Sequence, residues 1–239
     1  GLFVWTGFDY LGEPTPYWWP SRSSFFGIVD LAGFPKDIYY MYKSEWTNEP
    51  VLHIFPHWNW KEGEPVDIWA YYNNADEVEL YLNGKSLGVR QKTDSTYHVS
   101  WRVPFTPGTL KAVSRLGGKE VKEIHTAGEP ARLVLTPDRS VIQADGSDLS
   151  FVTIDVCDID GNRVPDATPL IRFSVEGPGE IAGTDNGDPN DPNSLRKPKR
   201  QAYYGKALVV IRNKGGQGDI HLKAIAEGLP EATVTIQAQ

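Results

Sequence analysis

Short runs of alternating apolar and polar residues, joined by tight turns, dominate the chain from Val51 onward and constrain its fold most strongly. Val66–Tyr71 and Val78–Leu82 alternate with a period of two, and the second run ends at Asn83-Gly84. That dipeptide is the strongest short-range signal for a two-residue β-hairpin, because both residues accept the positive φ that the turn requires. Further strands are expected at Ser86–Val89, Tyr97–Val103, Thr109–Arg115 and, after a Gly117-Gly118 turn, Glu120–Thr126. The pattern predicts an antiparallel immunoglobulin-like β-sandwich over residues 49–128.

A second run of the same kind follows Gly128-Glu129-Pro130, which is typical of a linker. Strands are expected at Ala131–Thr136, Val141–Gln143, Leu149–Val156, Ile171–Val175, Ala207–Arg212, Asp219–Ala226 and Ala232–Gln237. They predict a second immunoglobulin-like sandwich over residues 129–239. Residues 183–206 interrupt the rhythm as a long loop rich in Asn, Asp and Pro, and such a loop in a compact domain is usually functional or mobile.

Residues 1–48 differ from both sandwiches in being aromatic and rich in loops. An apolar strand, Leu2–Trp5, leads into a Gly- and Pro-rich loop, and the apolar spacing predicts a helix from Pro35 to about Trp46. A lone strand is not stable without neighbours. We therefore expect this segment either to take its sheet from elsewhere or to belong to a larger domain. Barrel enzymes build active sites from strand ends of this kind.

Charge and composition exclude several classes of protein. The net charge of −7 argues against a nucleic-acid partner, which needs a basic face. The one basic cluster, Arg196–Arg200, is predicted to be a solvated loop facing the acidic run Asp185–Asp191. Cys157 is the only cysteine and lies in an alternating run, which favours an inert buried thiol. No apolar run approaches the roughly 20 residues of a membrane span, so we expect a soluble chain.

Aromatic side chains crowd around two carboxylates in residues 5–20. The aromatic residues are Trp5, Tyr10, Tyr17, Trp18 and Trp19, and the acids are Asp9 and Glu13. Aromatic faces match the CH-rich faces of a pyranose, and carboxylates accept hydrogen bonds from sugar hydroxyls. The composition therefore indicates a carbohydrate site. The alternative, that the aromatic rings pack on the rest of a domain, stays equally open at this point.

Motifs along nearly the whole chain resemble glycoside hydrolase family 2, in particular its bacterial β-galactosidase-like members. Phe3–Tyr17 and Ser24–Asp37 resemble the eighth strand and last helix of the (β/α)8 barrel of that family. His53–Trp60 and Val78–Gly88 resemble the sandwich that follows the barrel, and Ala182–Asp188, Lys199–Gly205 and Leu208–Ile211 are similar to the C-terminal accessory sandwich. The resemblance implies a mainly β fold, with the end of a barrel in residues 1–48 followed by the two sandwiches.

The same resemblance implies a retaining glycosidase whose catalytic pair is absent from this chain. Such enzymes use two carboxylates about 5 Å apart. In the family both are glutamates on earlier barrel strands, and the acid/base lies in an Asn-Glu pair. The only Asn-Glu here is Asn48-Glu49, which follows the barrel segment. We therefore expect no catalytic residue and no cofactor in this chain, and no activity from the chain alone.

Three residues of the eighth-strand loop are implied as substrate contacts by the resemblance. The family counterpart of Trp5 forms the floor of the sugar subsite beside the cleaved bond. Asp9 and Tyr10 follow in the same loop and are assigned shaping or hydroxyl-binding roles. Glu13 is expected to be structural.

A second candidate lies in the first sandwich, where His57 stands beside Trp58 and Trp60. His57 and Trp58 are predicted to contact sugar at the barrel mouth. The alternative is that the stretch is a plug that packs between domains, and the sequence leaves both open.

Two acidic segments resemble cation sites without meeting their requirements. Asp158–Asn162 begins like a calcium loop but lacks the later bidentate Glu, so a hairpin turn is expected. Asp185–Asp191 is acidic enough to hold a cation, yet its Asn-Gly and Asp-Pro steps also explain an ordered turn. We predict no metal site.

Taken as a whole, the sequence predicts the C-terminal part of a retaining β-glycosidase, a β-galactosidase by resemblance. Its expected partners are a β-galactoside-like substrate and the N-terminal and barrel part of the same polypeptide, with a homo-oligomer as an option. A non-catalytic carbohydrate-binding or structural tandem sandwich remains the alternative. The compartment is not fixed, although periplasm or secretion is favoured over the cytoplasm.

Overall fold

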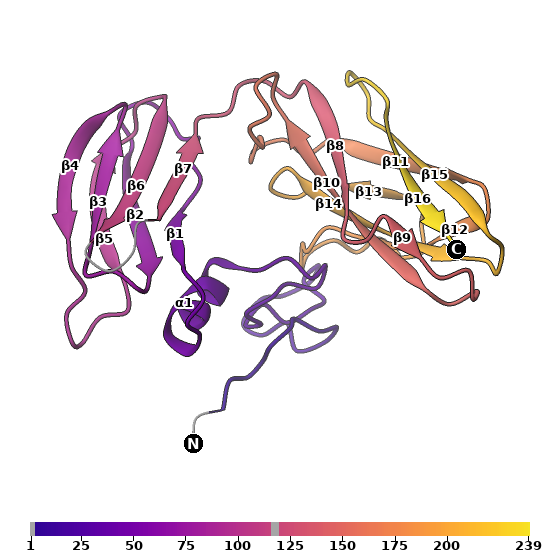
Figure 1. Ribbon diagram of the computed structural model, residues 1–239, viewed down its shortest axis with the longest axis horizontal. Helices are drawn as coiled ribbons and strands as arrows, with labels where there is room; N and C mark the ends of the chain where they lie inside the picture. The colour runs from indigo at the N-terminus through magenta and orange to yellow at the C-terminus, as the bar shows by residue number, and fades with distance from the viewer. Residues whose placement is uncertain (1–2, 116–119) are drawn as a thin grey trace. The chain divides into compact units, whose positions relative to one another are not determined.

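A computed structural model describes residues 3–115 and 120–239 and divides the chain into two compact units. One is continuous, residues 35–127, and is called the central unit here. The other combines residues 1–34 with 128–239 and is called the split unit. Figure 1 shows strands as the dominant element of both units, with one helix among the described residues. The expected turn at Gly117-Gly118 lies outside the described residues.

The central unit is a sandwich of a three-stranded and a four-stranded antiparallel sheet. One sheet has the order β1-β2-β5, with β1 Leu52–Phe55, β2 Pro65–Tyr72 and β5 Val99–Pro104. The other has the order β4-β3-β6-β7, with β3 Glu77–Leu82, β4 Lys85–Arg90, β6 Thr109–Arg115 and β7 Val121–His125. This arrangement confirms the predicted first sandwich.

Alternation explains the core of this sandwich. Ile68 on β2 and Leu80 on β3 point inward and are fully buried, and Trp101 on β5 lies in the same core. Burying each aliphatic side chain of this size contributes about 2 kcal/mol. Asn83 and Gly84 have φ values of 50° and 80°, as a type I′ hairpin between β3 and β4 requires.

The helix of the central unit is α1, Asp37–Trp46. It was expected to begin at Pro35, but Lys36 has an extended conformation and precedes the first helical residue. Lys36 is therefore the N-cap, and Pro35 lies just outside the helix rather than in its first turn.

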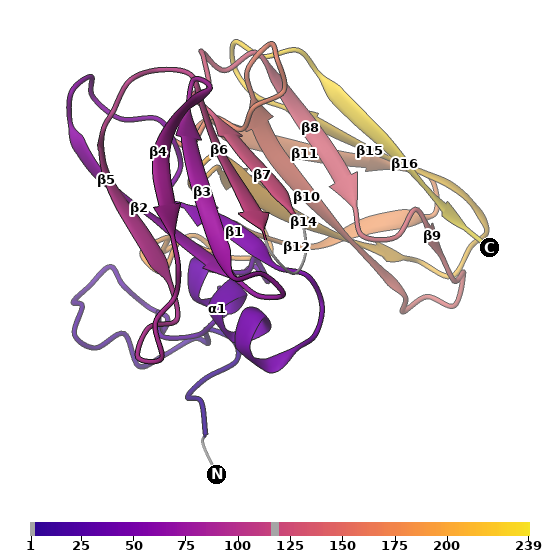
Figure 2. The same ribbon diagram turned by 60° about the vertical axis from the view of Figure 1, so that its left-hand side comes forward.

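The split unit contains a sandwich of a four-stranded and a five-stranded sheet, which lie face to face (Figure 2). The first has the order β12-β14-β10-β8, with β8 Arg132–Pro137, β10 Leu149–Cys157, β12 Gly179–Asp185 and β14 Lys206–Asn213. The second has the order β13-β11-β15-β16-β9, with β9 Val141–Ile142, β11 Leu170–Glu176, β13 Lys199–Gln201, β15 Gly218–Ile225 and β16 Ala232–Ala238. The predicted second sandwich is confirmed.

Two strands of the split unit were not expected from the sequence. β12 contains Gly179 and Gly183, and its register with β14 shifts between Ile181 and Gly183. Glycine is disfavoured in strands and the shift breaks the period of two, so the alternation is weak. β13 is three residues long within a charged run.

Residues 3–34 form neither a helix nor a regular strand. The expected strand Leu2–Trp5 is therefore wrong over its described part, residues 3–5. A strand needs a hydrogen-bonded neighbour, and pairing in this segment begins only at Phe8, which bridges Val29, and at Leu11, which bridges Ser23. The barrel origin of residues 1–48 and the boundaries at residues 48 and 128 stay predictions.

Candidate functional site

Asp9 fixes the conformation of residues 5–20, which are called the aromatic loop here. The residue is only 7% exposed, and its Oδ1 accepts hydrogen bonds from Gly27 N at 2.8 Å and Ser24 Oγ at 3.3 Å. A Cβ on Gly27 would lie 2.3 Å from the backbone nitrogen of Asp9. Only glycine permits this close approach. The geometry gives Asp9 a shaping role in the loop.

Trp5 and Tyr10 lie together on the exposed side of this loop. The Trp5 indole N–H donates to Tyr10 Oη at 3.2 Å, and the two rings meet edge to face with centroids 6.4 Å apart. Tyr10 in turn donates to the Glu13 carboxylate, and that hydrogen bond raises the pKa of Tyr10 above its ordinary value. Trp5 is 73% exposed, so its ring is open to a ligand. Glu13 is engaged by Tyr10, in agreement with a structural role.

The loop after β12 contacts the N-terminal segment, residues 3–34, which contains Trp5 and Tyr10. Arg22 N donates to the carbonyl oxygen of Pro189 at 2.9 Å. Gly187 has a φ of +76°, and a Cβ there would lie 2.2 Å from Asp30 Oδ2. Asp30 Oδ1 accepts a hydrogen bond from Phe34 N at 2.8 Å. The two sequence-distant parts of the split unit are therefore in backbone contact.

Residues 183–201 are ordered by a buried arginine. Arg200 is not solvated, contrary to the expectation for the basic cluster, and its guanidinium donates to Asp191 Oδ2 at 2.5 Å, to Thr184 O at 2.9 Å and to Ser194 O at 2.9 Å. Burial raises the pKa of Asp191, but hydrogen bonds from Asn193 and Arg200 outweigh that effect and hold it below its ordinary value. The charge that compensates Asp191 in this acidic loop is therefore the guanidinium of Arg200.

The second candidate pair, His57 and Trp58, lies in the central unit, and the two side chains have different environments. Trp58 is 1% exposed, its ring packs on Phe105, and its indole N–H donates to Thr106 O at 3.0 Å. Trp58 is thus a core residue, and the prediction that it contacts sugar is wrong because its ring has no accessible face. His57 stacks on Trp60 with centroids 4.8 Å apart and an angle of 11°. His57 stays a candidate.

The remaining acidic turn and the cysteine have structural explanations. Asp158 N donates to Asn162 O, and the Asp158 carboxylate accepts from Asn162 N and from Gly128 N, which confirms the predicted hairpin turn. Cys157 is buried, and burial raises the pKa of its thiol. Within residues 3–115 and 120–239, no group of three or more His, Cys, Asp or Glu side chains is placed to hold a metal ion. No helix in these residues is long and apolar enough to cross a membrane.

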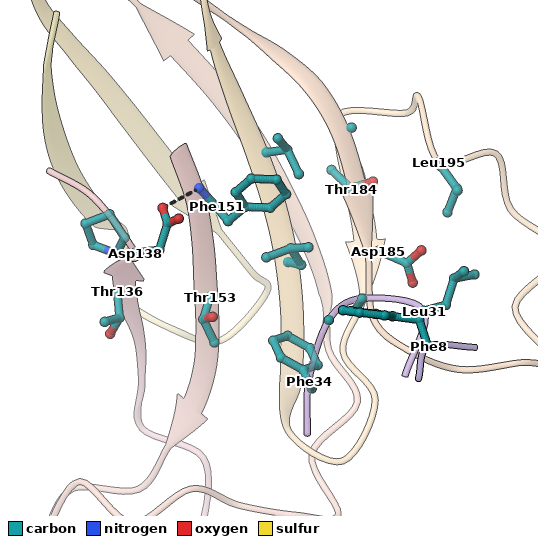
Figure 3. Close-up of a pocket in the computed structure, with 16 residues that line it drawn as sticks. Phe8, Leu31, Phe34, Thr136, Asp138, Phe151, Thr153, Thr184, Asp185 and Leu195 are labelled. Carbon is teal, nitrogen blue, oxygen red and sulfur yellow. Dashed lines mark hydrogen bonds between the residues drawn. The ribbon is translucent and has the colours of Figure 1, made fainter. Parts of the chain in front are cut away.

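A groove that sequence reasoning missed lies on the outer face of the β12-β14-β10-β8 sheet. Its volume is about 610 Å³, and Figure 3 shows Phe8 and Phe34 on one side of it and Phe151 and Asp138 on another. The lining residues come from residues 8–34 and from residues 136–210, which lie more than 100 positions later. The signal that could have indicated it is Phe151, whose position in the alternating run Leu149–Val156 places an aromatic ring on the solvent face of the sheet.

Comparisons with known proteins match both units. The family description "Glycoside hydrolase family 2 C-terminal domain 5" matches residues 133–235, and "Domain of unknown function (DUF4982)" matches residues 63–122. Beta-galactosidase BoGH2A of Bacteroides ovatus is 59% identical over 241 residues, which cover 100% of this chain and 28% of that protein. The chain belongs to glycoside hydrolase family 2.

Other members of glycoside hydrolase family 2 show the same partial coverage. A β-glucuronidase of Formosa agariphila is 31% identical over 220 residues, or 89% of this chain and 22% of that protein. A solved family 2 member from Bacteroides cellulosilyticus superposes with a TM-score of 0.90 at 32% identity, covering 98% of this chain and 35% of that structure. The chain thus spans about a fifth to a third of the length of these relatives. It corresponds to their C-terminal part, and the catalytic residues of the family lie elsewhere.

Proposed function

We propose that the chain contributes one wall of the sugar site of a retaining β-galactosidase. Trp5 provides the aromatic floor, Tyr10 orients it through the indole hydrogen bond, and Asp9 holds the loop. The observation that carries the proposal is the open Trp5 ring, because an exposed indole fixed at its N–H suits a pyranose face. The 59% identical relative is named a β-galactosidase, which supports the substrate class.

The charges of the loop favour a neutral sugar over a uronic acid. Residues 5–20 contain no Lys, Arg or His, and their two charged side chains are the acids Asp9 and Glu13. A glucuronide brings a carboxylate, which needs a cationic partner to replace its hydration. The loop supplies none, so a galactoside is the better fit to this wall of the site.

The test is a pair of measurements on two proteins. The 239-residue chain alone is expected to give no turnover of a chromogenic β-galactoside, because a retaining mechanism needs two carboxylates about 5 Å apart and Asp9 and Glu13 are committed to the loop. In the longer enzyme that contains this chain, Trp5→Ala is expected to lower kcat/KM for that substrate about 10- to 100-fold, or roughly 1.4 to 2.7 kcal/mol.

The control is Trp46→Ala, which removes another exposed indole from α1. It is expected to leave kcat/KM within about twofold. Turnover by the 239-residue chain, or equal losses from the two tryptophan variants, would contradict the proposal. Binding of a galactoside to a longer enzyme that never hydrolyses it would instead favour the non-catalytic carbohydrate-binding alternative.

A further inference from the structure

The floor of the groove is built from two rows of residues on the β12-β14-β10-β8 sheet, and the first row crosses all four strands. In the first row Thr153 lies opposite Thr136 on one side and Leu208 on the other, and Leu208 lies opposite Asp185. Strands are about 4.8 Å apart, so a row of four extends roughly 14 Å. The row therefore has the length of a small oligosaccharide rather than of a single sugar.

The second row lies beside the first and carries an aromatic ring. Phe151 is opposite Val210, which is opposite Gly183. Asp138 adjoins Phe151, whose backbone N–H donates to Asp138 Oδ1 at 2.7 Å. Phe151 is 42% exposed although it lies within β10. The ring is thus presented to the groove from a rigid element, with a carboxylate beside it (Figure 3).

The walls turn this sheet face into a concave site. Phe8, Leu31 and Phe34 come from the N-terminal segment, and Leu195 comes from the segment between β12 and β13. The hydrogen bond from Arg22 N to Pro189 O and the close approach of Gly187 to Asp30 fix that segment against the loop after β12. A volume of about 610 Å³ falls within the range of roughly 300 to 1,000 Å³ that is typical of ligand sites.

The polar groups of the groove define the ligand class. The 16 lining residues include three Thr and two Asp but no Lys, Arg or His. Lys206 contacts the Phe34 ring, with Nζ 4.6 Å from its centroid, and does not line the groove. The hydroxyls of Thr136 and Thr153 have no protein partner in the described part of the chain. Such a site offers hydroxyls, carboxylates and rings, and it offers no partner to a phosphate or a uronic acid.

We propose that this groove is a second carbohydrate-binding site, which takes a neutral oligosaccharide of two to three sugar units lying across the strands. Phe151 stacks against a pyranose face, and Thr136, Thr153 and Asp138 exchange hydrogen bonds with its hydroxyl groups. The groove is lined neither by Trp5 nor by Tyr10. It is therefore distinct from the proposed Trp5 site, although Phe8 of the same loop forms part of its wall, and the failure of either proposal leaves the other standing.

The experiment titrates the 239-residue chain with β-1,4-galactotriose while backbone amide shifts are recorded by NMR. Shifts are expected at Thr136, Phe151 and Thr153, with saturable binding. Phe151→Ala is expected to weaken binding at least tenfold, and Thr153→Val, which keeps the shape and removes the hydroxyl, about three- to fivefold. Both positions lie on the outer face of the sheet, and circular dichroism of each variant verifies its fold.

Matched controls separate this groove from other sites. Val134→Ala changes a residue on the same face of β8 outside the groove, and Trp5→Ala changes the aromatic loop. Val134→Ala is expected to bind the galactotriose as the unchanged chain does, and Trp5→Ala is expected to keep the chemical-shift changes at Thr136, Phe151 and Thr153. A trisaccharide of the same length with a terminal glucuronic acid is expected to bind at least tenfold more weakly.

Several outcomes would overturn the proposal. One is the absence of chemical-shift changes at the three groove residues up to roughly 10 mM galactotriose, a concentration at which even a complex with a millimolar dissociation constant would be detected. Another is binding that survives Phe151→Ala but is lost in Trp5→Ala, which would assign the sugar to the aromatic loop. Light scattering that shows a dimer abolished by Phe151→Ala would make the groove an interface between copies of the chain.

Discussion

Arg200 and Asp191 form an ion pair, with Nη1 2.5 Å from Oδ2, and neither side chain is more than 6% exposed. The remaining guanidinium donors bind Thr184 and Ser194. Removing one member of a buried pair leaves the other charge without compensation, which costs about 3 to 5 kcal/mol. This pair therefore determines whether the loop that supports residues 22–34 keeps its conformation.

We expect Arg200→Met to destabilise the split unit by about 3 to 5 kcal/mol, because it leaves Asp191 buried and unpaired. Urea unfolding followed by circular dichroism measures the free energy. Arg212→Met is the matched control, since Arg212 pairs with Glu180 at the surface and such pairs contribute about 1 kcal/mol or less. Equal losses from the two variants would contradict the assignment.

Gly187→Ala is expected to destabilise the contact between the loop after β12 and the N-terminal segment. The new Cβ would lie 2.2 Å from Asp30 Oδ2, and the backbone has a positive φ. Gly33→Ala serves as control, because Gly33 also has a positive φ but nothing lies within 4 Å of its Cβ position. We expect Gly187→Ala to cost at least 1 kcal/mol more than Gly33→Ala.

Amide hydrogen exchange shows which part of the chain loses stability in Gly187→Ala. In Gly187→Ala the amide of Arg22, bonded to Pro189 O, is expected to exchange faster than in the unchanged chain. The exchange of β2 in the central unit is expected to stay the same. Unaltered protection at Arg22 would show that the close approach of Gly187 to Asp30 has no mechanical role.

Trp58→Ala is expected to unfold the central unit preferentially. Deleting a fully buried indole costs about 3 to 5 kcal/mol. Trp60 lies two residues away and is 38% exposed, so Trp60→Ala is expected to cost less than about 2 kcal/mol. Differential scanning calorimetry of both variants compares the two; a Trp58 variant as stable as the Trp60 variant would refute the core role.

Stability is expected to fall at acidic pH through Asp148. Hydrogen bonds from Gln143 N and from Arg139 lower the pKa of this carboxyl to about 2. An unfolded Asp titrates near about 3.9, so the stabilisation is complete above that pH and is lost as the pH falls towards 2. Asp191, whose pKa is also lowered, acts in the same direction.

Thermal melting between pH 6 and about pH 2 tests this dependence. Asp148→Asn is expected to flatten the acid limb of the profile of melting temperature against pH, because the variant has no proton to take up at that site. Asp94→Asn, in the exposed turn at residues 93–96, is expected to leave the profile unchanged. An unaltered slope in Asp148→Asn would contradict the prediction.

Local pattern sufficed for most of the fold and for little of the site. Val78–Leu82 followed by Asn83-Gly84 predicted a hairpin correctly, because side-chain alternation and turn preferences are local properties of the sequence. Trp58 could not be assigned that way, since whether an indole faces core or ligand depends on tertiary packing against Phe105. The groove was invisible for a similar reason, because Phe8 and Phe151 become neighbours of one cavity only after the chain has folded.

The basic cluster illustrates how a correct local observation can give a wrong structural expectation. Its composition, Arg196 to Arg200, is typical of a solvated loop, and most of it is exposed. Arg200 departs from its neighbours because Asp191, Thr184 and Ser194 together satisfy its donors in the interior. No periodicity in the sequence marks which arginine finds such acceptors.

The residues that contact the N-terminal segment come much later in the sequence, and this determines when those contacts can form during synthesis. More than 150 residues separate Phe34 from Asp191, and the whole central unit is translated between them. At roughly 5 to 20 residues per second, the nascent aromatic loop waits on the order of 10 s for its support. The ribosome therefore completes the central unit before the split unit, and the exposed tryptophans of residues 5–20 lack the support of the loop after β12 during that interval.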